Sequence, residues 1–301
     1  MKAVLCKQYG LPDTLVVENI PSLAPAAGQV VVSMKAAGVN FPDALIIQGK
    51  YQVKPPMPFS PGSELAGVVK AVGEGVSQPR PGDAVIAYAG YGGYAEEVLV
   101  DARACIPMPL GVDFKVAASF MMTYGTSYHA LKDRALLQPG ETLLVLGAAG
   151  GVGSAAVELG KLMGARVIAA ASSDDKLEAC KQLGADATIN YSNEDLRAGV
   201  KRITEGKGVD VVYDPVGDQF AEPAMRDMAW GGRYLVIGFA GGEIPKIPLN
   251  LPLLKGSSIF GVFWGDFTRR EPKRFADSIG QLGKWFHEGK LKPHVSQTFP
   301  L

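Results

Sequence analysis

The sequence predicts an α/β protein in which a β-rich N-terminal region is followed by a doubly wound parallel sheet. Short β-type segments separated by Gly and Pro fill roughly the first 120 residues. From Thr142 onward, apolar strand-like runs alternate with helical patterns, which is typical of parallel strands joined by crossover helices. The length of 301 residues is close to that of two domains.

The N-terminal region is predicted to form an irregular barrel or sandwich, because its β segments are short and repeatedly interrupted. The expected strands are residues 2–6, 15–19, 29–37, 64–72, 84–89 and 94–100. Turns with Pro and Gly in type II positions are expected at 80–83 and 138–141. The second of these turns precedes the change to alternating strands and helices.

The second region combines buried strands with amphipathic helices. The expected strands are residues 142–146, 166–170, 209–213, 233–238 and 258–263. The expected helices are residues 152–163, 174–183, 196–204 and 273–287, followed by an extended segment at 292–299. In the first helix, Val152, Ala156, Leu159 and Met163 form one apolar stripe, so we expect this helix to lie on the sheet.

Charge, hydropathy and cysteine content exclude several classes of protein. Thirty basic residues balance thirty acidic ones without a polybasic cluster, so nucleic acid is not an expected partner. The N-terminus lacks a secretory apolar core, and the longest uncharged stretch, 142–157, is shorter than a bilayer span. Cys6, Cys105 and Cys180 form no CxxC pair. We therefore expect a cytoplasmic protein with no membrane partner.

A glycine-rich turn joins the first strand of the second region to its first helix. Residues 143–153 read LLVLGAAGGVG, in which Gly150 and Gly153 match the second and third glycines of a dinucleotide-binding fingerprint. Ala148 replaces the first glycine. Free N–H groups at Gly150, Gly151, Val152 and Gly153 would face a phosphate at the helix N-terminus. The alternative is a tight turn whose glycines serve structure alone.

The end of the second strand indicates which dinucleotide is bound. An acidic residue that would hold the ribose 2′-hydroxyl of NAD is absent from the position of Ala171. Ser172, Ser173 and Lys176 follow instead, and hydroxyls with a cation suit the 2′-phosphate of NADPH. Two alternatives stay open: a serine that merely caps the next helix, and a shifted strand end at which Asp174 would favour NAD.

Several ordered motifs carry a family resemblance through nearly the whole chain. They are GVNFPD (38–43), GKY (49–51), PGSELAG (61–67), GEGV (73–76), GD (82–83), the glycine-rich turn, DPVG (214–217), GGR (231–233) and GVFWG (261–265). With them the chain resembles the zeta-crystallin-like quinone oxidoreductases of the medium-chain dehydrogenase/reductase superfamily.

The resemblance implies a domain plan. A GroES-like catalytic domain is expected at 1–125, an inserted Rossmann NADPH-binding domain at 126–265, and a segment returning to the catalytic domain at 266–301. Relatives in the family continue beyond the position matching Leu301, so the return segment is expected to be short.

The resemblance also implies an enzyme without zinc. Zinc-dependent relatives place a cysteine where this chain has Asn40 and a histidine where it has Ser63, and they carry a four-cysteine lobe that is missing here. The three cysteines and His129, His287 and His294 do not supply a replacement site. Without a metal to polarise an alcohol oxygen, reduction of an electron-poor acceptor is favoured over alcohol oxidation.

The family pattern assigns the catalytic positions. It implies that Asn40, Tyr51 and Tyr124 line the cleft between domains and that Thr126 contacts the nicotinamide. Asn40 would donate a hydrogen bond to the developing oxyanion, and Tyr51 would donate or relay a proton. The alternatives are a turn role for Asn40 and a packing role for Tyr51.

The same pattern implies further cofactor contacts and an assembly. Tyr191 would lie along the 2′-phosphate edge, and the backbone at Gly217, Gly238, Phe239 and Ala240 would pass close to the nicotinamide half. Residues 258–262 would pair with a second copy to form a homodimer.

The expected activity is NADPH-dependent transfer of hydride to a small-molecule acceptor, either a quinone or another conjugated carbonyl. An enoyl thioester reductase is the nearest alternative, although no cluster of basic residues suits the phosphates of an acyl-CoA. A non-catalytic NADPH-binding protein, of the crystallin or redox-sensing type, is the other.

Overall fold

The computed structural model describes all residues from Met1 to Leu301 and divides into two compact units. Unit 1 comprises Met1–Met122 and Pro293–Leu301, and unit 2 comprises Thr123–Lys292. The expected return segment, 266–301, is therefore shared between them. Its part in unit 2 packs through Trp285, whose ring meets Tyr128 edge-on, and through Arg274, which pairs with Asp133.

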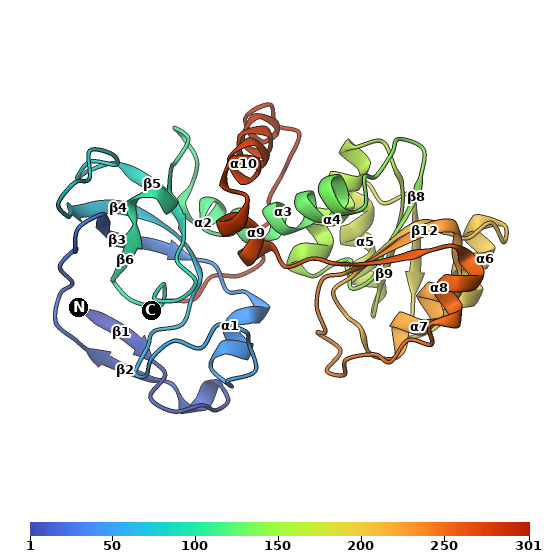
Figure 1. Cartoon of the computed structure of the whole chain (residues 1–301), viewed down its shortest axis with the longest axis horizontal. Coiled ribbons are helices and arrows are strands. Elements are labelled where there is room, and N and C mark those ends of the chain that lie inside the picture. The colour runs from blue at the N-terminus through green and yellow to red at the C-terminus, as the bar shows by residue number, and fades with distance from the viewer. The chain divides into compact units, whose positions relative to one another are not determined.

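Unit 1 is built from antiparallel strands (Figure 1). Its strands are β1 (Lys2–Leu5), β2 (Val16–Asn19), β3 (Gln29–Ala37), β4 (Glu64–Val72), β5 (Ala84–Tyr88), β6 (Glu97–Asp101) and β7 (Cys105–Pro107). Five of them form a sheet in the order β6-β3-β4-β5-β7, and β1 pairs with β2. Valines alternate into the core, as at Val30, Val32, Val85 and Val98. The β-rich character predicted for this region is confirmed.

Short helices fill the connections of unit 1. They are η1 (Pro12–Thr14), α1 (Phe41–Ile46), η2 (Ala102–Ala104) and α2 (Phe114–Ala117). The sequence pattern missed all four, because a helix of one or two turns shows too little periodicity. Helix α3 (Met121–Tyr128) begins at the end of unit 1 and continues as a π-helix, η3 (His129–Arg134), in unit 2.

Unit 2 contains a six-stranded parallel sheet in the order β10-β9-β8-β11-β12-β13. Its strands are β8 (Thr142–Val145), β9 (Arg166–Ala171), β10 (Ala187–Asn190), β11 (Val209–Asp214), β12 (Met228–Val236) and β13 (Ser258–Gly261). In chain order this is 3-2-1-4-5-6, the arrangement of a Rossmann domain. The predicted doubly wound sheet is confirmed.

The helices of unit 2 cover both faces of its sheet (Figure 1). They are α4 (Gly151–Leu162), α5 (Asp174–Gln182), α6 (Leu196–Thr204), α7 (Asp218–Arg226) and α8 (Asn250–Lys255). Two further helices, α9 (Trp264–Arg270) and α10 (Pro272–His287), pack instead on η3 and α3, through the His129–Phe267 and Tyr128–Trp285 ring contacts. Helices α4 and α5 follow β8 and β9, and α6, α7 and α8 pack on the opposite face, where Val200, Ala224 and Leu251 join one core cluster. The direction of winding therefore reverses between β8 and β11.

Helix α4 is buried more completely than its predicted stripe requires. Its residues from Ala155 to Gly160 are all buried, including the acidic residue Glu158. Glu158 is tolerated there because one carboxylate oxygen accepts a hydrogen bond from the Tyr124 hydroxyl and the other from the Lys292 backbone N–H. The stripe of Ala156 and Leu159 is confirmed, but Val152 and Met163 are only partly buried.

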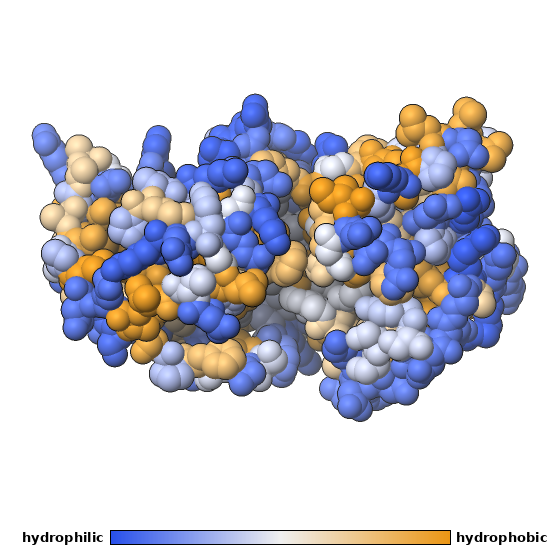
Figure 2. Space-filling model, turned by 90° about the horizontal axis from the view of Figure 1, so that it is seen from below, coloured by the Kyte–Doolittle hydropathy of each residue, from blue (hydrophilic) through white to orange (hydrophobic).

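The surface mixes apolar and polar residues. On the face drawn in Figure 2, hydrophobic and hydrophilic side chains are interspersed over both units. None of the helices combines the length and the apolar character needed to cross a membrane.

A buried carboxylate ties the N-terminal segment of unit 1 to its sheet. Glu97 of β6 accepts hydrogen bonds from the Ser22 hydroxyl, the Leu23 N–H and the Lys70 ammonium group. These donors, the Lys70 contact first, lower the pKa of Glu97 from 4.5 to about 2. Because the folded pKa is depressed, this contribution to stability is present above pH 4.5 and is lost as the pH falls toward about 2.

We expect Glu97→Gln to lower the free energy of unfolding at neutral pH by about 1–3 kcal/mol, because Lys70 loses its charged partner. The loss should shrink as the pH falls from 4.5 to about 2. Urea denaturation of both proteins across this range measures the difference. Glu74→Gln, at an exposed position, is the control. A difference that does not change with pH would contradict the role given to Glu97.

Candidate functional site

The carboxyl ends of β8 and β11 lie side by side where the winding of the unit 2 sheet reverses. In open α/β sheets ligands bind at this place, because the loops from the two neighbouring strands diverge to opposite faces. The loops after β8 and β11 are the glycine-rich turn and the DPVG segment, 214–217. The fold thus brings together two motifs separated by some 60 residues of sequence.

The glycine-rich turn leads directly into α4. Gly147 has a φ of +55°, which the left-handed turn after β8 requires, and the N–H of Gly150 bonds to its carbonyl at 2.9 Å. Gly147 therefore provides the backbone freedom expected of the fingerprint's first glycine. Ala148 follows, fully buried, with its N–H bonded to the carbonyl of Ala170 at 3.0 Å.

Close packing between the turn and α4 leaves no room for a side chain at Gly153. A Cβ atom there would lie 2.3 Å from the Gly147 oxygen. The first intrahelical bond of α4 runs from Ser154 N–H to Gly150 O, so the N–H groups of Gly151, Val152 and Gly153 precede it. Because glycines leave the N-terminus of α4 without side chains, a phosphate can approach its N–H groups closely. This arrangement fits the pyrophosphate of a dinucleotide.

The N-terminus of α4 is held in place by a buried hydroxyl network. The Ser127 hydroxyl on α3 lies 2.9 Å from the Val152 carbonyl and 2.8 Å from the Thr123 carbonyl. The hydroxyl of Tyr213, fully buried in β11, lies 2.8 Å from the same Ser127 oxygen. These contacts join α3, α4 and the central strand β11, so the first turn of α4 has a fixed position.

The polar residues expected at the end of β9 form one cluster. The Lys176 ammonium group donates to the Ser172 hydroxyl at 3.0 Å. The Tyr191 hydroxyl, next along the chain after β10, also interacts with Ser172, and its ring packs on Phe220 with centroids 4.5 Å apart. Burial raises the pKa of Tyr191. An exposed cation beside two hydroxyls has the chemistry of a phosphate site.

The two other residues weighed at this strand end lie close by. Ser173 is the N-cap residue of α5, but its side chain makes no capping hydrogen bond. Asp174, in the first turn of α5, accepts a hydrogen bond from the Asn190 amide at 2.7 Å. The Asp174 carboxylate is thus directed toward the neighbouring strand β10.

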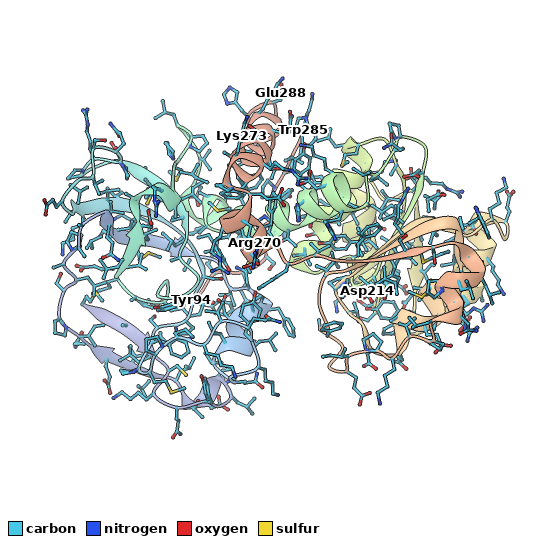
Figure 3. All side chains as sticks on the ribbon, viewed as in Figure 1. Tyr94, Asp214, Arg270, Lys273, Trp285 and Glu288 are labelled. Carbon is cyan, nitrogen blue, oxygen red and sulfur yellow. The ribbon has the colours of Figure 1, made fainter.

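Asp214 fixes the loop after β11 (Figure 3). It is 2% exposed, and one carboxylate oxygen accepts from the Val216 and Gly217 N–H groups at 2.7 and 2.8 Å. The other oxygen accepts from the Tyr234 hydroxyl of β12. Burial raises the pKa of Asp214, and the three donors oppose that shift.

The loops after β11 and β12 lie against each other. The Gly238 and Ala240 N–H groups bond to the carbonyls of Asp214 and Pro215. Gly217 has a φ of +67°, and a Cβ atom there would lie 2.9 Å from the Phe239 ring. The structure thus brings Gly217, Gly238, Phe239 and Ala240 together beside the sheet's carboxyl edge.

Tyr124 and Thr126 lie on α3 and are both buried. The Tyr124 hydroxyl donates to Glu158 at 2.6 Å, and burial, with the Glu158 carboxylate, raises the pKa of Tyr124. Its proton is therefore committed to Glu158, and the catalytic role predicted for Tyr124 would require that hydrogen bond to open. That role stays a prediction, as does the cofactor contact of Thr126.

In unit 1, Asn40 stands between two buried acids. Its backbone N–H donates to the Asp43 carboxylate at 2.8 Å, and its side-chain amide donates to the Glu64 carboxylate at 3.2 Å. Glu64 begins β4, is completely buried, and also accepts from the Met122 N–H at 2.9 Å. Burial raises the pKa of Glu64 from 4.5 to about 8.

Asp43 is held by a tyrosine as well as by Asn40. Tyr94 lies in unit 1 (Figure 3), and its hydroxyl donates to Asp43 at 3.0 Å. Burial raises the pKa of Asp43, while the bonds from Asn40 and Tyr94 oppose the shift. Asp43 therefore anchors the loop that presents Asn40.

Tyr51 is half-buried against the cluster of Cys6, Ile46, Ile47 and Phe59. Burial and the charge of Asp43 raise the pKa of its hydroxyl. The structure gives this hydroxyl no hydrogen-bond partner, so it is available to another molecule. The ring of Tyr51 therefore has the packing role given as its alternative, and its hydroxyl is still available for catalysis. The catalytic role of Tyr51 stays a prediction.

Sequence reasoning missed Glu64 as the partner of the Asn40 side-chain amide. Glu64 had one signal, since an acid at the head of an otherwise apolar strand must be paired or neutral when buried. No sequence signal indicated that Gly38 is needed beside Glu64. A Cβ atom at position 38 would lie 2.5 Å from the Ala118 carbonyl oxygen and 3.0 Å from the Glu64 carboxylate. The absence of a side chain at Gly38 thus makes room for Glu64 beside Asn40.

The structure places no group of three or more His, Cys, Asp or Glu residues where they could hold a metal ion. At the position where zinc-dependent relatives carry histidine, Ser63 is buried and contacts the Met122 sulfur at 3.8 Å.

Comparisons with known proteins agree with this architecture. Residues 26–110 match the alcohol dehydrogenase GroES-like domain, and residues 151–281 match the family described as zinc-binding dehydrogenase. A quinone oxidoreductase-like protein 2 homolog of Nematostella vectensis is 40% identical, over 100% of this chain and 82% of the relative.

Two solved structures are similar over almost the whole chain. Escherichia coli quinone oxidoreductase, complexed with NADPH, matches with a TM-score of 0.92 and 28% identity, over 98% of this chain and 91% of that chain. The CurK enoyl reductase matches with a TM-score of 0.89 and 27% identity, over 99% of this chain and 92% of that chain.

Proposed function

Since the chain belongs to the quinone oxidoreductase-like family of the medium-chain dehydrogenase/reductase superfamily, we propose that it is an NADPH-dependent reductase of quinones or other conjugated carbonyls. The observation that carries the proposal is the Ser172, Lys176 and Tyr191 cluster at the end of β9, in the same unit as the glycine-rich turn. A reductase of this kind needs both a phosphate-binding helix and a determinant for the 2′-phosphate.

Unit 2 would bind the cofactor. Gly151, Val152 and Gly153 would hold its pyrophosphate through backbone N–H groups, and Gly150, whose N–H is bonded to Gly147, would permit its close approach because it has no side chain. Ser172, Ser173, Lys176 and Tyr191 would hold the 2′-phosphate, because a cation and hydroxyl donors complement its charge. Thr126, Gly217, Gly238, Phe239 and Ala240 would approach the nicotinamide half, where small or backbone groups permit close contact.

Unit 1 would orient the acceptor. Bound NADPH supplies a hydride to an electron-poor carbon, and negative charge then develops on the acceptor oxygen. The Asn40 carboxamide would donate a hydrogen bond to this oxygen. The Tyr51 hydroxyl, which has no partner in the structure, would deliver or relay the proton.

An enoyl thioester reductase is the second candidate, and the similarity to the CurK enoyl reductase favours it. The chemistry is closely related, since hydride again enters at the β-carbon of a conjugated carbonyl. The two candidates differ in the size and charge of the substrate.

We also propose that the enzyme works without zinc, because Asn40 and Ser63 stand where zinc-dependent relatives carry ligands, and no cluster of metal-binding side chains replaces them. Elemental analysis of active protein tests this proposal, and stoichiometric zinc would overturn it.

We propose a homodimer that forms through β13. This strand is at the edge of the unit 2 sheet and pairs only with β12, and large apolar side chains are exposed near it. Trp230 on β12 is 80% exposed, Leu253 on α8 is 77% exposed, and Ile259 on β13 is 42% exposed. Two copies joined edge to edge would extend the sheet and cover these side chains.

Light scattering at micromolar concentration should give twice the mass of the chain. Ile259→Glu should shift the mass toward the monomer, because the isologous contact places the two charges near each other. Ile244→Glu, in a different exposed loop, is the control. Monomer alone in the unaltered protein would contradict the proposed dimer.

Cofactor choice is tested by binding. We expect NADPH to bind more tightly than NADH, and Lys176→Ala to weaken NADPH binding about tenfold while leaving NADH unchanged, because one charge-assisted bond to the 2′-phosphate is lost. Fluorescence titration of both cofactors measures this. Lys181→Ala, on the same helix, should have no effect, and an NADH preference in the parent protein would refute the assignment.

Acceptor class is tested by following NADPH consumption with a panel of quinones, alkenals and enoyl-CoA esters. We expect turnover of quinones or enones and little turnover of the CoA esters. Asn40→Ala should lower turnover about a hundredfold, and Tyr51→Phe about tenfold to a hundredfold, with NADPH affinity unchanged. Preferred turnover of enoyl-CoA would establish the second candidate instead.

A further inference from the structure

Two carboxyl groups hold Asn40 from two directions. Asp43 accepts the backbone N–H of Asn40, and Glu64 accepts its side-chain Nδ2 at 3.2 Å. The loop and the amide are therefore controlled separately: Asp43 fixes where Asn40 stands, and Glu64 fixes how its carboxamide is turned.

Glu64 is an unusual partner because it is buried without a cation. It is completely inaccessible to solvent, forms no ion pair, and its second oxygen is engaged by the Met122 N–H at 2.9 Å. The oxygen facing Asn40 is bonded to a side chain, whereas the other oxygen is bonded to the backbone. A buried acid without a countercharge readily takes up a proton.

The carboxamide of Asn40 has a donor and an acceptor on opposite sides. While Glu64 is ionised, its oxygen accepts, so Nδ2 turns toward it and the carbonyl oxygen of Asn40 turns away. When Glu64 carries a proton on that oxygen, the acid donates to the Asn40 carbonyl, and the amide NH₂ turns away instead. Only the second arrangement presents both amide protons to a developing oxyanion.

We propose that Glu64 is a positioning residue whose protonation turns the Asn40 carboxamide into the orientation that donates to the acceptor oxygen. The proposal rests on the proposed function, in which Asn40 stabilises that oxygen. It adds a residue that never touches the acceptor and acts through Asn40 alone.

The surroundings of Glu64 place the change in an accessible pH range. Burial, with a smaller contribution from the nearby Asp43 carboxylate, raises its pKa to about 8, and the hydrogen bonds from Met122, Asn40 and Met121 oppose this shift. The other titratable groups near Asp43 are Tyr94 and Tyr51, and burial raises the pKa of both hydroxyls. Glu64 is thus expected to change charge as the pH rises through about 8.

The pH dependence of kcat/KM for the acceptor tests the proposal. In the parent protein this ratio should fall as the pH rises through about 8, approaching a tenfold loss per pH unit. Glu64→Gln should keep neutral-pH activity within about threefold and abolish the fall, because the new amide accepts from Met122 and donates permanently to the Asn40 carbonyl. Glu18→Gln, an exposed change of the same kind, should retain the fall.

Glu64→Ala should be slow at every pH, since nothing then directs the Asn40 amide. If Glu64→Gln retains the alkaline fall of the parent, or is as slow as Glu64→Ala, the positioning role is wrong. A folded state for each variant is checked by circular dichroism and NADPH titration.

A measurement without turnover separates this proposal from the proposed function. The side-chain amide resonances of Asn40 in ¹⁵N-labelled parent protein should shift with a midpoint near pH 8, and the shift should vanish in Glu64→Gln. Resonances that stay constant from pH 6 to 10 would overturn the proposal even in an active enzyme. A shift in a protein that reduces no acceptor would support the Glu64–Asn40 coupling and refute only the reductase assignment.

Discussion

A buried acid must be supplied with hydrogen-bond donors or lose its charge, and three such acids determine the loops of both candidate sites. Asp214 closes the turn after β11 and ties it to β12. Glu158 joins α4 to Tyr124 of α3 and to the chain at Lys292. Glu64 holds Asn40 and the N-terminal end of α3. In each case one carboxyl group fixes segments that are far apart in the sequence.

The fold was largely predictable because its signals are local. Apolar runs at β8, β9 and β11 alternate with helical patterns at α4, α5 and α6, and this alternation is enough to specify a parallel sheet. The short helices of unit 1 and the helices α7, α8 and α9 were not predicted. Pro223 interrupts the pattern within α7, and α8 is only six residues long. Such elements are stabilised by tertiary packing more than by their own periodicity.

The candidate sites were predictable only in part. The glycine-rich turn is one short segment of sequence, and the residues directly after β9 are another. The residues within each segment lie close together once its strand and helix are placed. The contact between Asn40 and Glu64 spans 24 residues and depends on the pairing of β3 with β4 and on the missing side chain at Gly38. Tyr124 shows another limit: the family resemblance selects it as a catalytic position, but no sequence signal indicates that its hydroxyl bonds to Glu158, 34 residues away.

The division of unit 1 into two separate stretches of chain affects how the protein emerges from the ribosome. Unit 2 is one continuous stretch, Thr123–Lys292, and can complete its fold as soon as its last helix has been synthesised. Unit 1 also includes Pro293–Leu301, which the ribosome adds only after unit 2 has been synthesised. The two stretches of unit 1 can therefore meet only after the whole of unit 2 has been synthesised, although the synthesis of unit 1 begins first.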